Sequence, residues 1–443
     1  MSRLTRFELE SMSPAERTRL LRRSAVPDRA IRVGAAEICD RVLAEGDAAV
    51  ADCARRLGGG FHLLTRDEME RAVQNADPRL VRAIEDAADR IRLFHRAQIP
   101  AELQVTTAPG VEITRRWQPL SRVGAYVPGG KAAYPSTALM TVIPAKVAGV
   151  DEVVVASPAG PDGTVSQAML VAATLAGADE VWAMGGAQAI AALAYGTETV
   201  KPVETSVGPG NAWVTAAKLA VYGACAIDLP AGPSEVLVLA DHTADPRIVA
   251  VDLLCQAEHG PDSPAVLVTT DPALPEAVER ALDELLPSME RADILSQALA
   301  DHGWAVVAPD HAAAVEFAND YAGEHVTIVT EDPEADAKKV TAAGSVYVGH
   351  WSPESAGDYA TGANHVLPTG GLAAACGPLA VEDFGSWRQE QRITEDGLGG
   401  ILDTIVTLAS AEGLTAHRLA AEMRFAKHDR QPAGGDGPEG MRQ

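Results

Sequence analysis

The feature that most constrains the fold of this chain is an alternation of apolar runs and helical segments that begins near residue 111. The apolar runs are short, rich in Val, Leu, Ile and Ala, and separated by glycine-containing loops and segments with helical spacing. Buried strands that alternate with helices are typical of parallel sheets covered by helices on both faces. The sequence therefore predicts an α/β protein with doubly wound sheets in two successive units. The expected strands are 111–117, 121–126, 152–157, 180–184, 226–229, 235–240, 265–269, 304–307, 326–329 and 345–348.

Size and charge exclude several classes of protein. The 443 residues are enough for two or more domains with real cores. A net charge of −24 without basic patches argues against binding to nucleic acid or to a membrane surface. The chain shows no apolar run of transmembrane length and no signal peptide. Its five cysteines are odd in number and scattered, which predicts free thiols in a reducing cytoplasm: Cys39, Cys53, Cys225, Cys255 and Cys376.

Three glycine-rich turns stand where an expected strand passes into an expected helix, at 127–130, 185–188 and 208–211. Such turns expose main-chain N–H groups at a helix N-terminus, where an anion such as a pyrophosphate is stabilised. None of them matches the G-x-G-x-x-G fingerprint, and each alone is compatible with a plain turn. Three in one sheet favour nucleotide binding.

The segment from Gln256 to Asp262 ends a helix that Asp245 and Pro246 begin. Gln256 and His259 are three residues apart, so both side chains leave the last turn on one face. An imidazole and an amide oxygen so placed can hold a metal ion, or can simply cap the helix end. Cys255 beside them is a thiol nucleophile only in principle, because no base is fixed next to it.

Further polar groups of the kinds used in metal binding and proton transfer follow downstream. A Glu324–His325 pair enters a strand, where the imidazole suits a general base, although an exposed loop pair is the alternative. Asp358 and His365 lie in a long polar loop, and Glu412 and His417 flank a helix break near the C-terminus. Amide, imidazole and carboxylate ligands together suit Zn²⁺, and carboxylate-rich sets also take Mn²⁺.

These motifs together resemble the histidinol dehydrogenase family. The resemblance runs in order from about residue 20 to 427 and is carried by 124–130, 185–190, 207–211, 231–236, 256–262, 324–325, 364–365 and 412–417. It implies a zinc-dependent enzyme that oxidises L-histidinol to L-histidine through L-histidinaldehyde, with two NAD⁺, in histidine biosynthesis. It also implies two incomplete Rossmann-like domains with small helical terminal pieces, in an intertwined cytoplasmic homodimer.

The resemblance also implies residue roles. Glu324 and His325 would be the catalytic acid–base pair, with His325 taking the hydroxyl proton and Glu324 activating water. One zinc per chain would be held by Gln256, His259, Asp358 and His417. Substrate contacts would come from Ser234, Gln256, His259, His325, Asp358, His365, Glu412 and His417. NAD would contact Tyr126, Gln188 and Asn211.

The implied domains divide the chain as follows. Residues 1–24 are expected to form a helical arm, and 25–125 with 236–375 a first α/β domain with the metal and catalytic residues. Residues 126–235 would form the NAD-binding domain. A C-terminal helical segment, 376–427, would contribute to the neighbouring chain's site, before a disordered tail at 428–443.

The chain departs from the family pattern at a few positions. Gly323 replaces the usual proline before the Glu–His pair, and 373–374 and 377–379 differ from the usual Ala-Arg and Ser-Gly-Leu. These changes leave two alternatives open: an NAD-dependent dehydrogenase of another small polar alcohol, or a non-catalytic NAD-binding homologue. The intact Asp358, Glu412 and His417 favour histidinol.

Overall fold

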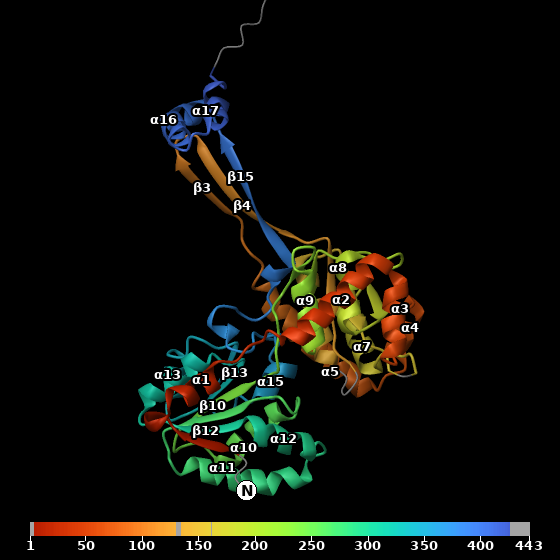
Figure 1. Ribbon diagram of the computed structural model, residues 1–443, viewed down its shortest axis with the longest axis vertical. Coiled ribbons are helices and arrows are strands. Elements are labelled where there is room, and N and C mark those ends of the chain that lie inside the picture. Colours follow the sequence, from red (N-terminus) through yellow and green to blue (C-terminus); the bar gives the residue numbers. More distant parts are fainter. Residues whose placement is uncertain (1–3, 130–133, 161, 426–443) are drawn as a thin grey trace, which may run out of the picture. The chain divides into compact units, whose positions relative to one another are not determined.

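The computed structural model of the protein describes residues 4–129, 134–160 and 162–425 (Figure 1). The chain divides into two compact units. The large unit contains Met1–Ile99 and Pro119–Ser386, and the small unit contains Pro100–Gln118 and Trp387–Gln443. The predicted disordered tail at 428–443 and Gly130 of the first glycine turn lie outside the described residues.

The large unit contains two six-stranded sheets, of which the first, here called sheet A, is parallel throughout. Its strands stand in the order β1-β12-β11-β10-β13-β14. Their bounds are β1 Thr5–Glu8, β10 Val236–Ala240, β11 Ala265–Thr269, β12 Gly303–Val307, β13 His325–Val329 and β14 Ser345–Val348. The central strands are buried along their whole length, as expected for a sheet covered on both faces.

Alternate residues of sheet A pack against helices on opposite faces. Val236 and Val238 share a core with α10 Pro246–Ala257, α11 Leu274–Leu285 and α12 Ala292–His302. Leu237 and Leu239 share the other core with α1 Pro14–Leu21 and α13 His311–Tyr321. The remaining elements around sheet A are α14 Pro333–Ala337, α15 Glu354–Tyr359, and the 3₁₀ turns Leu9–Ser11, Leu286–Ser288 and Leu372–Ala374. The doubly wound α/β prediction is confirmed for this sheet.

The expected all-helical arm at 1–24 is wrong in part. The capping box of Ser13 and Glu16 does begin α1, as predicted. However, residues 5–8 form β1, which pairs in parallel with β12 at the edge of sheet A. Only Phe7 of this strand is buried, so the segment shows no recognisable run of apolar residues. Its conformation depends on the neighbouring strand rather than on its own sequence.

The second sheet of the large unit, sheet B, has the strand order β2-β7-β6-β5-β8-β9 and is parallel except for the short edge strand β2. Its strands are β2 His62–Leu63, β5 Arg122–Tyr126, β6 Glu152–Ser157, β7 Glu180–Ala183, β8 Thr205–Val207 and β9 Ala226–Ile227. The helices around it are α2 Arg29–Glu45, α3 Asp47–Arg56, α4 Arg66–Gln74, α5 Pro78–Arg96, α6 Pro135–Ala148, α7 Gln167–Ala176, α8 Gly186–Tyr195 and α9 Ala212–Val221.

The N-terminal helices belong with sheet B, which differs from the predicted grouping of 25–125 with 236–375. Helices α2 and α3 share a core with α8 and α9, while α5 packs on α6. The strand at 122–126 is likewise a central strand of sheet B. An amphipathic helix shows which of its faces is buried, but its periodicity does not say which sheet it covers.

The small unit is a three-stranded sheet with two helices. Its strands stand in the order β15-β4-β3, with bounds β3 Leu103–Ala108, β4 Val111–Pro119 and β15 Gly385–Ile393. The guanidinium of Arg115 lies over the ring of Trp387, with its carbon 3.7 Å from the ring centroid. Helices α16 Glu395–Ala411 and α17 Thr415–Glu422 follow, and Gly413 between them has a φ of 72°. The predicted helix break at Gly413 is therefore confirmed.

The C-terminal segment 376–427 is not entirely helical as expected. It also contains the 3₁₀ turn Val381–Phe384 and strand β15. This strand is polar and exposed along most of its length, so no apolar alternation marks it in the sequence. Among the helices of the described chain, none combines the length and the apolar character needed to cross a membrane.

Candidate functional site

Three elements around sheet A bring polar side chains together. Helix α10 ends at Ala257, so Gln256 lies in its last turn and His259 just beyond it. Strand β13 begins with His325, directly after Glu324. Helix α15 carries Glu354 and Asp358, four residues apart and hence on one face. The site thus combines groups from three separate stretches of the chain between Gln256 and Asp358, since β10, α10 and β13 are neighbours in space.

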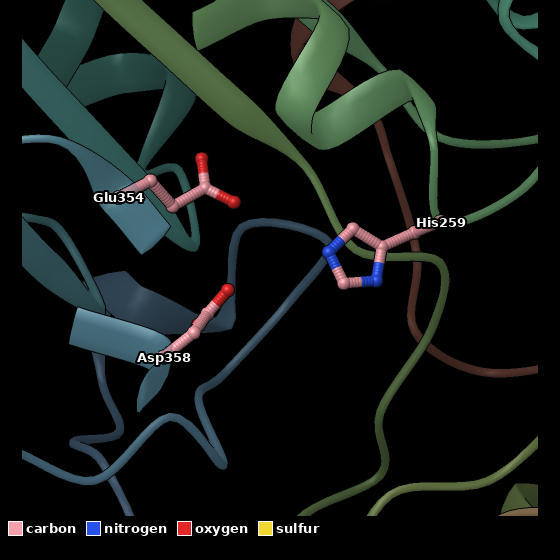
Figure 2. A group of neighbouring side chains, drawn as sticks. All are labelled: His259, Glu354 and Asp358. Atoms are coloured by element: carbon pink, nitrogen blue, oxygen red, sulfur yellow. The ribbon is translucent and has the colours of Figure 1, made fainter. Parts of the chain in front are cut away.

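His259, Glu354 and Asp358 form a cluster with the spacing of metal ligands. One ligand atom from each lies within 4.8 Å of the others, and the three side chains point toward one another in Figure 2. His259 is exposed by its surface area, yet the surrounding protein lowers its pKa, which favours the neutral imidazole that binds metals. Burial raises the pKa of Asp358, and His259 opposes this shift.

Several buried polar atoms of this region have no hydrogen-bonding partner within the described residues. They are the side-chain amide atoms of Gln256, both carboxyl oxygens of Glu354, and the Nε2 atoms of His325 and His365. Buried polar atoms are nearly always hydrogen-bonded in folded proteins, and exceptions need an explanation. A bound ligand or metal would supply the missing partners. The unpaired oxygen and nitrogen donors therefore fit a zinc ion, which binds both kinds.

The catalytic pair predicted from the sequence is buried and held by main-chain groups. Glu324 accepts a hydrogen bond of 2.9 Å from the main-chain N–H of Glu235, and the Ser234 hydroxyl lies 3.4 Å from its other oxygen. The Nδ1 atom of His325 lies 3.2 Å from the main-chain oxygen of Glu235 and 3.6 Å from a Glu324 oxygen. A carbonyl oxygen only accepts, so Nδ1 carries the proton and donates it there. Nε2 is left with a free lone pair.

Burial perturbs both members of the pair. Desolvation lowers the pKa of His325 to about 3, so its imidazole is neutral at physiological pH. Desolvation also raises the pKa of Glu324 well above the usual range for a carboxyl group. A neutral imidazole with a free Nε2 can accept a proton from a substrate hydroxyl. By contrast, burial raises the pKa of the Cys255 thiol far above neutrality, which removes the thiolate that a cysteine nucleophile requires.

The other predicted substrate and metal residues divide between the two units. His365 is half-buried in the large unit, close enough to His259 and His325 to affect the pKa of each. Glu412 and His417 belong to the small unit, at the junction of α16 and α17, and both are exposed. The cluster in the large unit is formed without them.

The residues predicted to contact NAD lie at the carboxyl edge of sheet B. The Tyr126 hydroxyl, at the end of β5, accepts a 3.1 Å hydrogen bond from the main-chain N–H of Gly186. Gln188 is buried in the first turn of α8. Asn211 caps α9, accepting from the N–H groups of Trp213 and Val214. As predicted, the turns at 185–188 and 208–211 each open a helix.

Glycine is required at one of these turns by a close approach of main chains. A Cβ atom on Gly208 would lie 2.2 Å from the Tyr126 carbonyl oxygen, and the φ of Gly208 is 107°. Asp228 accepts a 2.7 Å hydrogen bond from the Gly208 N–H, and the buried Lys218 ammonium donates to the Gly208 oxygen and pairs with Asp228. These contacts hold the turn in place.

Sequence reasoning missed Glu354 and Glu235. The stretch around Asp358 was expected to be a long polar loop, whereas residues 354–359 form α15. Had residues 354–359 been predicted as a helix, the spacing of four would have placed Glu354 and Asp358 on one face. Glu235 gives no such signal, because it acts through its main-chain N–H and C=O groups.

Fold and site together define an α/β enzyme in which a buried glutamate–histidine pair lies beside a cluster of metal-ligand type, with glycine turns suited to an anionic cofactor on a second sheet. This arrangement is expected of a dehydrogenase, which uses a general base for the substrate's proton and a dinucleotide cofactor for its hydride.

Comparison with known proteins identifies the family within that class. The family model for histidinol dehydrogenase matches residues 21–425. The histidinol dehydrogenase of Halobacterium salinarum is 48% identical over 421 residues, covering 94% of this chain and 97% of that protein. That of Methanothermobacter thermautotrophicus is 45% identical over 394 residues, covering 88% and 92%. The crystal structure of histidinol dehydrogenase from Elizabethkingia anophelis superimposes with a TM-score of 0.90 at 35% identity, covering 96% and 99%. The chain belongs to the histidinol dehydrogenase family, which consists of NAD-dependent oxidoreductases of histidine biosynthesis.

Proposed function

We propose that this protein oxidises L-histidinol to L-histidine through L-histidinaldehyde, with two NAD⁺ as hydride acceptors. The observation that carries the proposal is the neutral, buried His325 with a free Nε2, next to Glu324 and to the cluster of His259, Glu354 and Asp358. Membership of the family supports the substrate. Oxidation of an alcohol needs a base for the hydroxyl proton while hydride leaves for the nicotinamide, and His325 is prepared for that role.

The two members of the pair take different parts in the reaction. His325 accepts the hydroxyl proton at Nε2, because Nδ1 is committed to the Glu235 carbonyl oxygen. In its ionised form, Glu324 takes a proton from the water that adds to the aldehyde, and Ser234 and the Glu235 N–H hold its carboxylate in place. The hydrate then gives up a second hydride. The burial of both groups excludes bulk water from the reacting atoms.

A zinc ion fits the donor set at the cluster. We propose Gln256, His259 and Asp358 as its ligands from the large unit, with the unpartnered Glu354 carboxyl beside them and His417 as the remaining ligand. When bound, zinc would anchor the substrate's amine and imidazole nitrogens and favour the ionised form of nearby carboxyl groups.

NAD⁺ is proposed to bind at the carboxyl edge of sheet B, at Tyr126, Gln188 and Asn211. Support comes from the turns at 185–188 and 208–211, which begin helices α8 and α9. The positive end of the helix dipole at such an N-terminus stabilises a phosphate anion.

We further propose that Glu412 and His417 act in the site of a second copy of the chain, within an intertwined homodimer. Among the described residues of the small unit, only Val111, Gly397, Ala409 and Ala421 are buried. A unit with so little core needs a partner surface to be stable. Its exposed apolar side chains are Leu103, Val105, Ile393, Leu408, Leu414, Leu419 and Met423.

A hybrid dimer tests the shared site. Homodimers of His325→Ala and of His417→Ala should each be nearly inactive. If His417 acts in the partner's site, a hybrid made by co-refolding carries both lesions in one site and none in the other, so activity returns. If all ligands came from one chain, both hybrid sites would carry a lesion, and an inactive mixture would refute the proposal.

The stoichiometry of NADH formation tests the function itself. We expect two NADH per L-histidinol consumed, without accumulation of free aldehyde, measured by absorbance against a limiting amount of substrate. A panel of other small polar alcohols run in parallel should give no comparable rate. One NADH per substrate, or a preference for another alcohol, would overturn the proposal.

A further inference from the structure

A buried glutamate that the reaction does not use, Glu235, connects the catalytic pair to the N-terminal segment. Its main-chain N–H donates to Glu324, and its main-chain oxygen accepts from both the main-chain N–H and the Nδ1 of His325. The position of this one peptide segment therefore determines where both catalytic side chains point. Any shift of Glu235 changes the geometry of the two groups together.

The side chain of Glu235 is anchored by an ion pair in the interior. Its carboxylate pairs with the guanidinium of Arg23, and its other oxygen accepts a 3.1 Å hydrogen bond from the N–H of Gly370. The Glu235 side chain is 2% exposed and that of Arg23 is 10% exposed. A buried carboxylate is costly unless it is paired and hydrogen-bonded, so removal of Arg23 leaves Glu235 without its counter-charge.

Arg23 also holds the other segment that leads into the catalytic pair. Its guanidinium donates to the main-chain oxygen of Tyr321, the last residue of α13, and lies over the Tyr321 ring with its carbon 3.3 Å from the centroid. Glu324 follows Tyr321 by only three residues. One guanidinium thus connects the start of β10 with the segment that enters β13.

We infer that Arg23 is a positioning residue for the oxidation, which acts through Glu235 and Tyr321 to hold Glu324 and His325 in reactive geometry. This inference rests on the proposed function for its kinetic test. Misplacement of reacting groups by about 1 Å can cost on the order of 10²-fold in rate, so the loss of a group that touches no substrate is measurable. Lysine cannot replace Arg23 fully, because a single ammonium lacks the fork and the planar face that reach Glu235, the Tyr321 oxygen and its ring together.

A cavity beside the ion pair makes a direct test feasible. The cavity has a volume of about 590 Å³ and is lined by Arg23 and Glu235 together with Arg19, Gly232 and Trp304, among others. A small cation can therefore reach the carboxylate of Glu235 when the arginine side chain is absent. Guanidinium itself is the probe that reproduces the missing group.

The experiment measures kcat and KM for L-histidinol in Arg23→Ala, Arg23→Lys and wild type, with zinc content and thermal unfolding as checks on integrity. We expect kcat to fall on the order of 10²-fold in Arg23→Ala with little change in KM or zinc content, and to be intermediate in Arg23→Lys. Guanidinium chloride, below concentrations that unfold the protein, should raise kcat of Arg23→Ala but not of wild type, and ammonium chloride should not. Absence of rescue in a folded variant would overturn the inference.

Arg17→Ala is the matched control, because Arg17 lies in the preceding helix α1 and pairs with Asp320 of α13 at 2.5 Å, on the surface and away from Glu235. Its kcat should equal that of wild type. If kcat fell equally in Arg17→Ala and Arg23→Ala, the role of Arg23 would be only to hold the N-terminal segment in place, and the inference would be refuted.

If Arg23→Ala does not fold, the double variant Arg23→Met with Glu235→Gln removes both charges and leaves none unpaired. We expect it to fold, to keep a low kcat and not to respond to guanidinium, whereas wild-type kcat would overturn the inference.

Nitrogen-15 NMR of labelled histidines gives a readout without turnover. The His325 signal, identified by its loss in His325→Gln, should report a proton on Nδ1 in wild type and altered protonation in the Arg23 variant. A wild type that fails to oxidise histidinol refutes the proposed function, while an unchanged His325 signal refutes only the role of Arg23.

Discussion

Sheet A and sheet B share one parallel architecture, yet their candidate binding groups lie at opposite edges. In sheet B the glycine turns follow β7 and β8 at the carboxyl ends of the strands, the usual ligand edge of such sheets. In sheet A, Glu235 precedes β10 and the Glu324–His325 pair begins β13, at the amino ends.

The difference shows two ways to build a site on the same scaffold. Sheet B offers main-chain N–H groups, so its geometry depends on glycines without a Cβ and on the turns that hold them. Sheet A offers buried ionisable side chains, so its geometry depends on partners that orient them and replace water around them. Substitutions should therefore affect chemistry in sheet A and cofactor affinity in sheet B.

The largest expected effect comes from the base. His325→Ala should lower kcat for histidinol by ~10²–10⁴-fold, because general-base catalysis is lost. Glu324→Ala should slow the oxidation of supplied L-histidinaldehyde more than that of the alcohol. Stopped-flow NADH formation with each substrate measures both steps. His311→Ala, which removes a partly exposed imidazole elsewhere around sheet A, should leave both rates unchanged. Equal damage to both steps by both catalytic variants would contradict the division of roles.

The second largest effect is expected on zinc affinity, from substitutions in the cluster of His259, Glu354 and Asp358. We expect wild type to bind one zinc per chain and His259→Ala to lose it. Glu354→Gln should weaken zinc binding by about 10–100-fold, the range seen when a group that supports ligands is changed. Metal analysis after dialysis and competition with a chelator provide the measurement. Glu258→Gln is the control, since this neighbouring carboxyl is exposed. If Glu354→Gln bound zinc as tightly as wild type, Glu354 would have no part in zinc binding.

In sheet B, Gly208→Ala should weaken NAD⁺ binding about tenfold, or ~1.4 kcal/mol, because the added Cβ would lie 2.2 Å from the Tyr126 carbonyl oxygen and would displace the turn. Gly223→Ala is a close control, because Gly223 has a similar φ of 110° but no atom within 4 Å of the added Cβ. Equilibrium titration of NAD⁺ by fluorescence measures both. Equal weakening in the two variants would show that backbone strain, rather than the turn at Tyr126, is responsible.

The last expected effect is on stability against pH rather than on rate or affinity. The pKa of His325 is lowered to about 3 in the folded protein, whereas an unfolded histidine titrates near about 6.5. As pH falls through this window the unfolded chain gains a proton that the folded chain does not, so stability is lost. The loss should approach about 1.4 kcal/mol per pH unit for this imidazole and be absent in His325→Gln. Denaturant midpoints of zinc-free protein measure the difference, and parallel pH dependences would contradict it.

Much of the fold follows from local sequence pattern. The strands at 152–157, 235–240 and 265–269 were predicted from their consecutive apolar residues, because the burial of both faces of a strand leaves a continuous apolar signal. The turns at 185–188 and 208–211 were likewise predicted from glycines at strand ends. The residue types of the candidate site were also recognisable, since imidazole, amide and carboxylate groups outside the core pattern carry chemistry.

Only the tertiary structure decided how these pieces combine. Strand β1 exists because β12 offers it an edge, and α2–α5 cover sheet B although their periodicity fits either sheet. Glu354 joins the cluster only once α15 forms, and Arg23 meets Glu235 across more than 200 residues of chain. Local pattern encodes which faces are buried and which residues are polar, whereas the pairing of distant groups depends on packing between elements, which no short stretch of sequence contains.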